Sequence, residues 1–231
     1  MPVQAITVRR RYQQIADQIA GLIRSQEFRP GDRLPPERVL AQRLRVSRPS
    51  VREAMIALEL AGLVEVRTGS GTYVRAPALA PSAPGAANDD AGPGPFEWIQ
   101  ARKLVEGEIA AVAARIVTDD QLAGLREAVT TMEQENAEGS TAELGDRRFH
   151  IGIAEATGNS VLVSIEEALW DQFRSPLWAR INRMGLTQEH RALWVRDHIA
   201  ILECLRRRDV RRARAAVHRH LVRVNRVLLE G

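Results

Sequence analysis

The sequence predicts a mainly α-helical protein of two domains, in which the only β-structure is a short hairpin near the N-terminal end. Apolar residues recur at helical spacing through most of the 231 residues. A short alternating stretch at residues 63–74 surrounds a glycine-bearing turn. Residues 76–95, APALAPSAPGAANDDAGPGP, contain too few large apolar side chains to offset the entropy of ordering, and they predict a linker. We therefore expect domains over residues 1–75 and 96–231.

The N-terminal domain is expected to contain three helices and then the hairpin. Pro30-Gly31 ends the first helix, Ser47 is a suitable N-cap for the third, and Gly62 ends it. The expected helices are residues 11–27, 36–44 and 48–61, and the expected strands are 63–67 and 72–74.

The C-terminal domain shows helical periodicity almost throughout. Thr118 and Asp209 are suitable N-caps, and Gly158-Asn159 separates two helices. The expected helices are residues 96–117, 119–138, 141–157, 160–173, 176–184, 187–208 and 210–230. An all-α bundle of six or seven helices follows.

Composition excludes several classes of protein. The single cysteine, Cys204, rules out a disulfide framework, and no uncharged apolar stretch is long enough to predict a membrane span or a secretory signal. We expect a globular protein of the cytoplasm.

The positive charge is confined to the N-terminal third. Residues 1–75 hold 13 Arg against 7 Asp and Glu, a net charge of +6, whereas the remainder holds 20 Lys and Arg against 22 acids, a net charge of −2. A compositional preference for Arg over Lys explains the choice of base but not this asymmetry. The asymmetry indicates a polyanionic partner for the first domain.

Two helices separated by a short turn and followed by a hairpin fit a winged helix-turn-helix. Arg48 and Arg52 are one helical turn apart and share a face of the third helix. Ser47 and Ser50 add donors at its N-terminus, and Arg38 begins the preceding helix. One such arginine is more simply a solvated surface charge. Together they predict binding to the phosphates and base edges of double-stranded DNA.

Residues 34–74, LPPERVLAQRLRVSRPSVREAMIALELAGLVEVRTGSGTYV, resemble the winged helix-turn-helix of the GntR family of bacterial transcription regulators. The resemblance implies that the DNA-contacting residues are Arg38, Ser47, Arg48, Ser50, Arg52 and, at the tip of the wing, Gly69. The family usually has Gly in the turn between the two helices, where this chain has Arg45. A non-glycine residue in a left-handed turn costs roughly 1 kcal/mol, so we expect this turn to be adjusted or strained.

Four metal-capable side chains are expected to point into the C-terminal bundle. Asp146 and His150 are four residues apart and share a helix face. His198 and His220 each lie within the apolar stripe of a separate helix. A single inward histidine is most simply a core residue with a hydrogen-bond partner, but an aspartate and three histidines favour a divalent metal.

The remaining histidines are expected to lie elsewhere. His190 is eight residues from His198, about 12 Å along the helix axis, so both cannot bind one ion. His218 lies roughly 160° around the helix from His220 and is expected to face outward.

The stretches DRRFHIGIAEATGN and DHIAILECLRRRDVRRARAAVHRHL resemble the FCD subclass of GntR regulators, whose effector domain holds a divalent metal through one Asp and three His. The resemblance implies the ligands Asp146, His150, His198 and His220. Such an O/N donor set suits Zn²⁺, Ni²⁺ or Mn²⁺.

The resemblance also implies a small organic acid as effector. Arg102 resembles the family arginine that pairs with an effector carboxylate, and Asn159 is a weaker candidate because Asn after Gly is most simply a turn residue. The stretches FEWIQARKLVEGEIAAVAA and LWDQFRSPLWARI are most similar to members that respond to sugar acids such as hexuronates and aldonates.

We therefore expect a ligand-responsive transcription regulator, a repressor rather than an enzyme, that binds a palindromic operator as a homodimer. Two alternatives stay open at this point. The bundle could be a metal-dependent hydrolase fused to a DNA-binding module, although the sequence has no nucleophile elbow or phosphate loop. The metal could also be purely structural in a DNA-binding protein that senses nothing.

Overall fold

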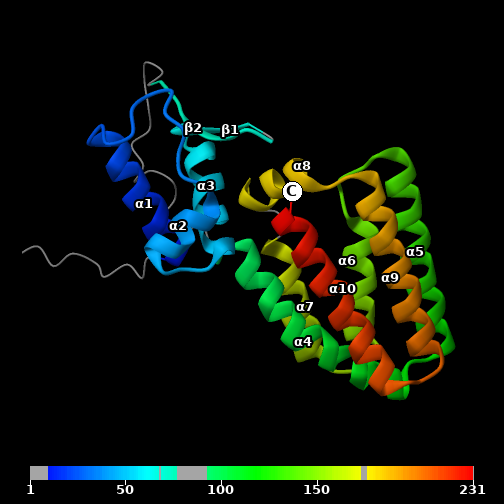
Figure 1. The fold of residues 1–231 in the computed structure, drawn as a ribbon. Helices are drawn as coiled ribbons and strands as arrows, with labels where there is room; N and C mark the ends of the chain where they lie inside the picture. The colour runs from blue at the N-terminus through cyan, green and yellow to red at the C-terminus, as the bar shows by residue number, and fades with distance from the viewer. Residues whose placement is uncertain (1–9, 68, 77–92, 173–175, 231) are drawn as a thin grey trace, which may run out of the picture. The chain divides into compact units, whose positions relative to one another are not determined.

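The computed structural model describes residues 10–67, 69–76, 93–172 and 176–230 (Figure 1). Most of the predicted linker, residues 77–92, lies outside this range. The chain divides into two compact units, Met1–Phe96 with Ser175–Arg180, and Glu97–Arg174 with Ile181–Gly231. Both units have the predicted fold class, since the first contains a winged helix-turn-helix and the second is all-α.

The first unit contains three helices and a two-stranded sheet. Its elements are α1 (Arg11–Arg24), α2 (Glu37–Leu44), α3 (Arg48–Leu60), β1 (Val64–Arg67) and β2 (Gly71–Val74). The first helix ends before the predicted residue 27 because Gln26 adopts a left-handed backbone conformation, with φ 60°. The other predicted boundaries agree closely.

The apolar stripes of α1 and α3 pack against each other. The buried side chains of these two helices lie at helical spacing and include Ile15, Ile19, Val51, Met55 and Leu58. Val64 of β1 and Val74 of β2 close the core from the hairpin. The packing leaves the N-terminal end of α3 outside the core.

The turn between α2 and α3 contains the two local features that the sequence suggested. Ser47 caps α3 by accepting a hydrogen bond from the Ser50 N–H at 3.3 Å. Arg45 adopts φ 54° and ψ 44°, in the left-handed region. The chain therefore makes the usual turn of the motif without the usual glycine, at a cost of roughly 1 kcal/mol.

The hairpin is antiparallel, with Val64 opposite Val74 and Arg67 opposite Gly71. A preceding segment, which the sequence did not predict as β, pairs with the free edge of β2. The Leu34 N–H donates to Thr72 O at 2.8 Å, and the Val74 N–H donates to Asp32 O at 2.9 Å. This extra pairing anchors the wing to the rest of the unit.

The second unit is a helical bundle. Its helices are α4 (Pro95–Ile116), α5 (Asp119–Glu138), α6 (Leu144–Glu155), α7 (Ser160–Asp171), α8 (Pro176–Gly185), α9 (Gln188–Arg206) and α10 (Val210–Glu230), of which α4 and α8 begin in the first unit. Neighbouring helices α5, α9 and α10 run side by side (Figure 1). Within the described ranges, none of the helices combines the length and the apolar character needed to cross a membrane.

Buried apolar residues from most of these helices form one core. Its members include Leu125, Val129, Phe149, Ile153, Ile201, Leu205, Val217 and Leu221. Two predicted caps are present: Thr118 forms a capping box with Gln121, and Asp209 accepts from the Arg212 N–H at 2.9 Å. The caps and the core together fix the directions of α5, α6, α9 and α10, which carry or surround the predicted metal ligands.

Gly145 lets α6 approach the backbone of α5 closely. A Cβ at this position would lie 2.6 Å from Met132 N and 2.7 Å from Ala128 O. We expect Gly145→Ala to lower the free energy of unfolding by about 1–3 kcal/mol or more, since backbone cannot move aside as a flexible side chain can. Chemical denaturation measures the change. Gly124→Ala on α5 is the matched control, because, apart from its own stretch of helix, no described atom lies within 4 Å of the added Cβ, and it should stabilise by about 0.5–1 kcal/mol. Equal effects of the two substitutions would contradict this account of the packing.

Candidate metal centre and nucleic-acid interface

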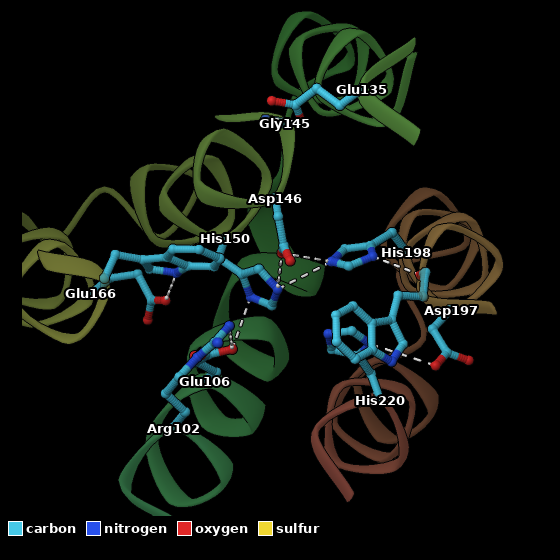
Figure 2. A network of polar contacts seen from close by, with 12 residues as sticks. Arg102, Glu106, Glu135, Gly145, Asp146, His150, Glu166, Asp197, His198 and His220 are labelled. Atoms are coloured by element: carbon cyan, nitrogen blue, oxygen red, sulfur yellow. Dashed lines mark hydrogen bonds and ion pairs between the residues drawn. The ribbon is translucent and has the colours of Figure 1, made fainter. Parts of the chain in front are cut away.

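The four predicted metal ligands lie together inside the second unit (Figure 2). Asp146 and His150 come from α6, His198 from α9 and His220 from α10. One ligand atom from each of the four side chains lies within 4.8 Å of the others. Residues separated by up to 74 positions thus converge because α6, α9 and α10 pack in one bundle.

The closest contacts join three of these groups. Asp146 Oδ1 lies 3.0 Å from His198 Nε2 and 3.2 Å from His150 Nε2, and the two Nε2 atoms are 3.2 Å apart. The His220 ring lies against that of His198, with ring centroids 4.5 Å apart. One ring nitrogen of each of the three histidines and one carboxylate oxygen of Asp146 therefore face a common point.

The other ring nitrogen of each histidine faces an acceptor. His150 Nδ1 is 2.8 Å from Glu106 Oε2, and His198 Nδ1 is 2.7 Å from the Trp194 carbonyl oxygen. His220 Nδ1 lies 3.5 Å from Asp197 Oδ2, beyond good hydrogen-bond geometry. Acceptors at Nδ1 favour the tautomer whose Nε2 lone pair is free to bind a metal.

Burial makes this donor set suitable for a cation. The side chains of the three histidines are 1–2% exposed, and that of Asp146 is 21% exposed. Two imidazole nitrogens and a carboxylate oxygen in mutual contact need a proton or a cation between them, because otherwise lone pairs face one another. Three imidazoles and one carboxylate fit Zn²⁺, Ni²⁺ or Mn²⁺.

Electrostatics within the cluster give two of the four groups, Asp146 and His220, the protonation state that binds a metal. Burial raises the pKa of Asp146, but the neighbouring His198 and His150 outweigh this and hold it well below its usual range. Burial and the charge of His198 lower the pKa of His220 to about 4. Asp146 is therefore an anion and His220 a neutral imidazole at neutral pH, which are the protonation states that bind metals. His150 differs: burial lowers its pKa, but Glu106 and Asp146 outweigh this and raise the pKa to about 9. A metal would therefore have to displace the His150 proton.

Arg102, the predicted partner of an effector carboxylate, lies next to this cluster on α4. Arg102 is 2% exposed, and its guanidinium carbon lies over the Trp170 ring, 4.5 Å from the ring centroid. It also forms a buried ion pair with Glu106, one helical turn further on. Sequence reasoning missed Glu106, although an Arg and a Glu four residues apart on one helix were visible in RKLVE.

The predicted DNA-contacting residues occupy one end of the α2–α3 motif and the wing. Arg38, Ser47, Arg48 and Gly69 are exposed, and Ser50 is half-buried beside Ser47. Arg52 is less exposed than a DNA-contacting residue is expected to be, since it is only 8% exposed. It lies near Glu37: burial raises the pKa of that carboxyl, and the charges of Arg52 and Arg48 partly oppose the effect.

Comparison with known proteins identifies both units. Residues 11–74 match the family described as bacterial regulatory proteins, gntR family, and residues 97–223 match the FCD domain. The chain belongs to the GntR family. Among its relatives, the Uxu operon transcriptional regulator of Escherichia coli strain K12 is 40% identical over 98% of this chain and 90% of the relative. The HTH-type transcriptional repressor NanR of an Enterobacter species is 33% identical over 90% of this chain and 81% of the relative.

A solved structure agrees with this assignment. The Streptococcus agalactiae GntR protein is 28% identical, with a TM-score of 0.50 over 93% of this chain and 99% of that chain. The GntR-family chain is thus a transcription regulator with an FCD domain, as its sequence predicted, and the hydrolase alternative has no support among these relatives, which are regulators.

The three remaining side chains that the sequence analysis named lie outside the cluster in this GntR-family chain. The Asn159 side-chain oxygen caps α7 by accepting from the Val161 and Leu162 N–H groups. His218 is exposed, and His190 lies at the start of α9, where its Nδ1 accepts from the Thr187 N–H at 3.4 Å.

A cavity of about 40 Å³ reaches Asp146 and His198 between α5 and α9. Such a cavity holds only a few water molecules, so a sugar acid would have to displace side chains.

Glu166 is a buried carboxyl that the sequence did not single out. Its Oε1 accepts from Trp170 Nε1 at 3.1 Å, whereas its Oε2 has no hydrogen-bond partner among the described residues. Burial and the neighbouring charge of Glu106 raise its pKa to about 7. Glu166 therefore carries a proton in the folded, metal-free protein through much of the acidic range.

This proton makes stability depend on pH. Between about pH 4.5 and 7 the folded protein holds a proton that the unfolded chain releases, so the free energy of unfolding falls as the pH rises, by about 1.4 kcal/mol per unit of pKa difference. We expect Glu166→Gln to remove this contribution, so that its stability relative to the wild type increases from about pH 5 to about pH 8. Denaturant unfolding of metal-free protein measures it, with the exposed Glu167→Gln as control. Parallel pH profiles for wild type and Glu166→Gln would contradict the prediction.

Proposed function

We propose that this chain is a repressor that binds a palindromic operator as a homodimer and is released by a sugar acid bound at a divalent metal. The observation that carries the proposal is the convergence of Asp146, His150, His198 and His220 in a domain attached to a winged helix-turn-helix. A relative named as a transcriptional repressor supports repression. As a regulator of bacterial genes, the protein would act in the cytoplasm, where the DNA lies.

The winged domain would bind DNA through the end of α3 and the wing. Arg48 lies at the exposed helix N-terminus, where a guanidinium can reach phosphates or a guanine edge. The proposed contacts are Arg38, Ser47, Arg48, Ser50, Arg52 and Gly69. Two copies on a palindrome would supply the specificity that one small set of contacts lacks.

The metal site would bind the effector. Asp146 and the three histidines would hold Zn²⁺, Ni²⁺ or Mn²⁺, and the ion would supply positive charge for an organic carboxylate. Arg102 lies beside the same cluster and would pair with that carboxylate. Asn159 would contribute at most through its amide N–H₂, because its oxygen caps α7. The effector would change DNA affinity only by as much as it prefers one arrangement of the two winged domains over the other.

The test is a thermal-shift screen of Zn²⁺-loaded protein against hexuronates, aldonates and small carboxylates, followed by a gel-shift assay with each compound that stabilises. We expect at least one sugar acid to raise the melting temperature and to release DNA. A compound that stabilises without changing DNA binding would indicate a site uncoupled from regulation. A protein that binds DNA, loads Zn²⁺ and responds to no acid would support the structural-metal alternative instead.

A further inference from the structure

We propose that Glu106 is a positioning residue that couples the metal to the effector: its carboxylate orients His150 for the metal and neutralises Arg102, so an effector carboxylate must compete with Glu106 for the guanidinium. This inference rests on the proposed function. It names a residue that links the metal ligands to the predicted carboxylate partner.

Glu106 contacts both groups with its two oxygens (Figure 2). Oε2 lies 2.8 Å from His150 Nδ1, and Oε1 accepts from Arg102 Nε. A further contact, from Arg102 Nη2 to Oε2, is 3.4 Å long. These contacts are shielded from water, since the side chains of Glu106 and Arg102 are each 3% exposed and that of His150 is 2% exposed.

Glu106, and not the nearby Glu166, is the coupling residue. The ligand atoms of Glu106, Glu166 and His150 lie within 4.8 Å of one another, so both carboxyls could in principle reach the imidazole. Glu106 makes the bonds to His150 and Arg102, whereas Glu166 bonds Trp170 and its Oε2 bonds no other residue in the part of the chain that the structure describes. One carboxylate therefore carries both connections.

The two connections predict opposite consequences of removing the charge. His150 would lose an anionic acceptor at Nδ1, which makes its Nε2 a weaker and less well oriented donor to a metal. Arg102 would lose its counter-charge in a buried site, which makes it a stronger partner for an incoming carboxylate. A residue with only a structural role would not shift metal and effector affinity in opposite directions.

The decisive experiment compares Glu106→Gln with Glu108→Gln. Glu108 lies on the same helix, is exposed, and pairs with Arg214 at 2.6 Å, so it controls for the loss of one acid from α4. Zn²⁺ affinity is measured by competition with a chromophoric chelator. We expect Glu106→Gln to bind Zn²⁺ about 10–100-fold more weakly and Glu108→Gln to bind as the wild type does. Wild-type Zn²⁺ affinity in folded Glu106→Gln would overturn the proposal.

The second measurement is the affinity of Zn²⁺-saturated protein for D-glucuronate and for acetate, by calorimetry. We expect tighter carboxylate binding by Glu106→Gln than by the wild type, and weaker or unchanged binding would overturn the competition. If neither compound bound the wild type, the proposed effector class would fail, and the Zn²⁺ measurement would still decide whether Glu106 positions His150.

A third variant separates a folding defect from a specific loss of Zn²⁺ affinity. Glu106→Gln removes the negative charge of a buried ion pair but keeps the positive charge of Arg102, so Arg102→Met/Glu106→Gln removes both charges of the pair. We expect the double variant to recover the stability of the metal-free protein but not the Zn²⁺ affinity. Recovery of both would assign Glu106 to stability alone and overturn the proposal. Imidazole ¹⁵N NMR of the Zn²⁺-bound proteins gives an independent readout, since the His150 Nδ1–H resonance should shift in Glu106→Gln and not in Glu108→Gln.

Discussion

Replacing His220 by Gln is expected to abolish tight Zn²⁺ binding, whereas His218→Gln on the same helix should leave it intact. His220 is 1% exposed and faces the other ligands, and His218 is exposed to solvent. A metal that binds only the folded protein stabilises it by about 2.7 kcal/mol at a concentration 100 times its Kd. The wild type and His218→Gln should therefore gain several degrees in melting temperature on addition of Zn²⁺, and His220→Gln should gain almost none.

Differential scanning calorimetry with and without Zn²⁺ measures this effect, and a chelator titration gives the affinities. The comparison is closely matched, since both substitutions remove an imidazole from α10. A wild-type response of His220→Gln to Zn²⁺ would show that His220 is not a ligand. A loss of Zn²⁺ response in both would show that the last helix, rather than one side chain, supports the site.

The Arg48→Ala/Arg52→Ala double variant is expected to lose specific DNA binding. Each specific arginine contact is worth about 1–3 kcal/mol, so the pair together predicts a loss of about 2–6 kcal/mol, or roughly 30-fold to 10⁴-fold in affinity. Fluorescence anisotropy at fixed salt, with a DNA fragment selected for binding from a random pool, measures it. Arg24→Ala, at the end of α1, is the control for loss of positive charge from this domain.

The single variants should differ because the two arginines differ in burial. Arg48 is exposed, so its loss should weaken DNA binding with little effect on stability. Arg52 is 8% exposed and close to Glu37, so its loss should also lower the melting temperature. A double variant that binds the selected fragment like the wild type would refute the assignment of α3 as the recognition helix.

The helices and the inward direction of the metal-capable side chains could be predicted because both depend on periodicity. Apolar spacing and caps such as Ser47, Thr118 and Asp209 are local properties of the chain, and they placed most helix boundaries close to those observed. His198 and His220 lie within apolar stripes, so their inward direction followed from the same pattern.

The partners of these residues depended on contacts between distant segments. Glu106 meets His150 only because the folded bundle brings these side chains of α4 and α6 together, and the pairing of Gly31–Leu34 with β2 joins a turn to a strand far along the chain. Helical periodicity indicates which face of α4 carries Arg102, but it does not show that Glu106 already neutralises this guanidinium. The burial of Arg52 likewise depends on how α2 meets α3. Helix propensity, capping and side-chain direction act over a few residues and can be inferred from one segment, whereas charge pairing, burial and pKa depend on which segments the folded core brings together.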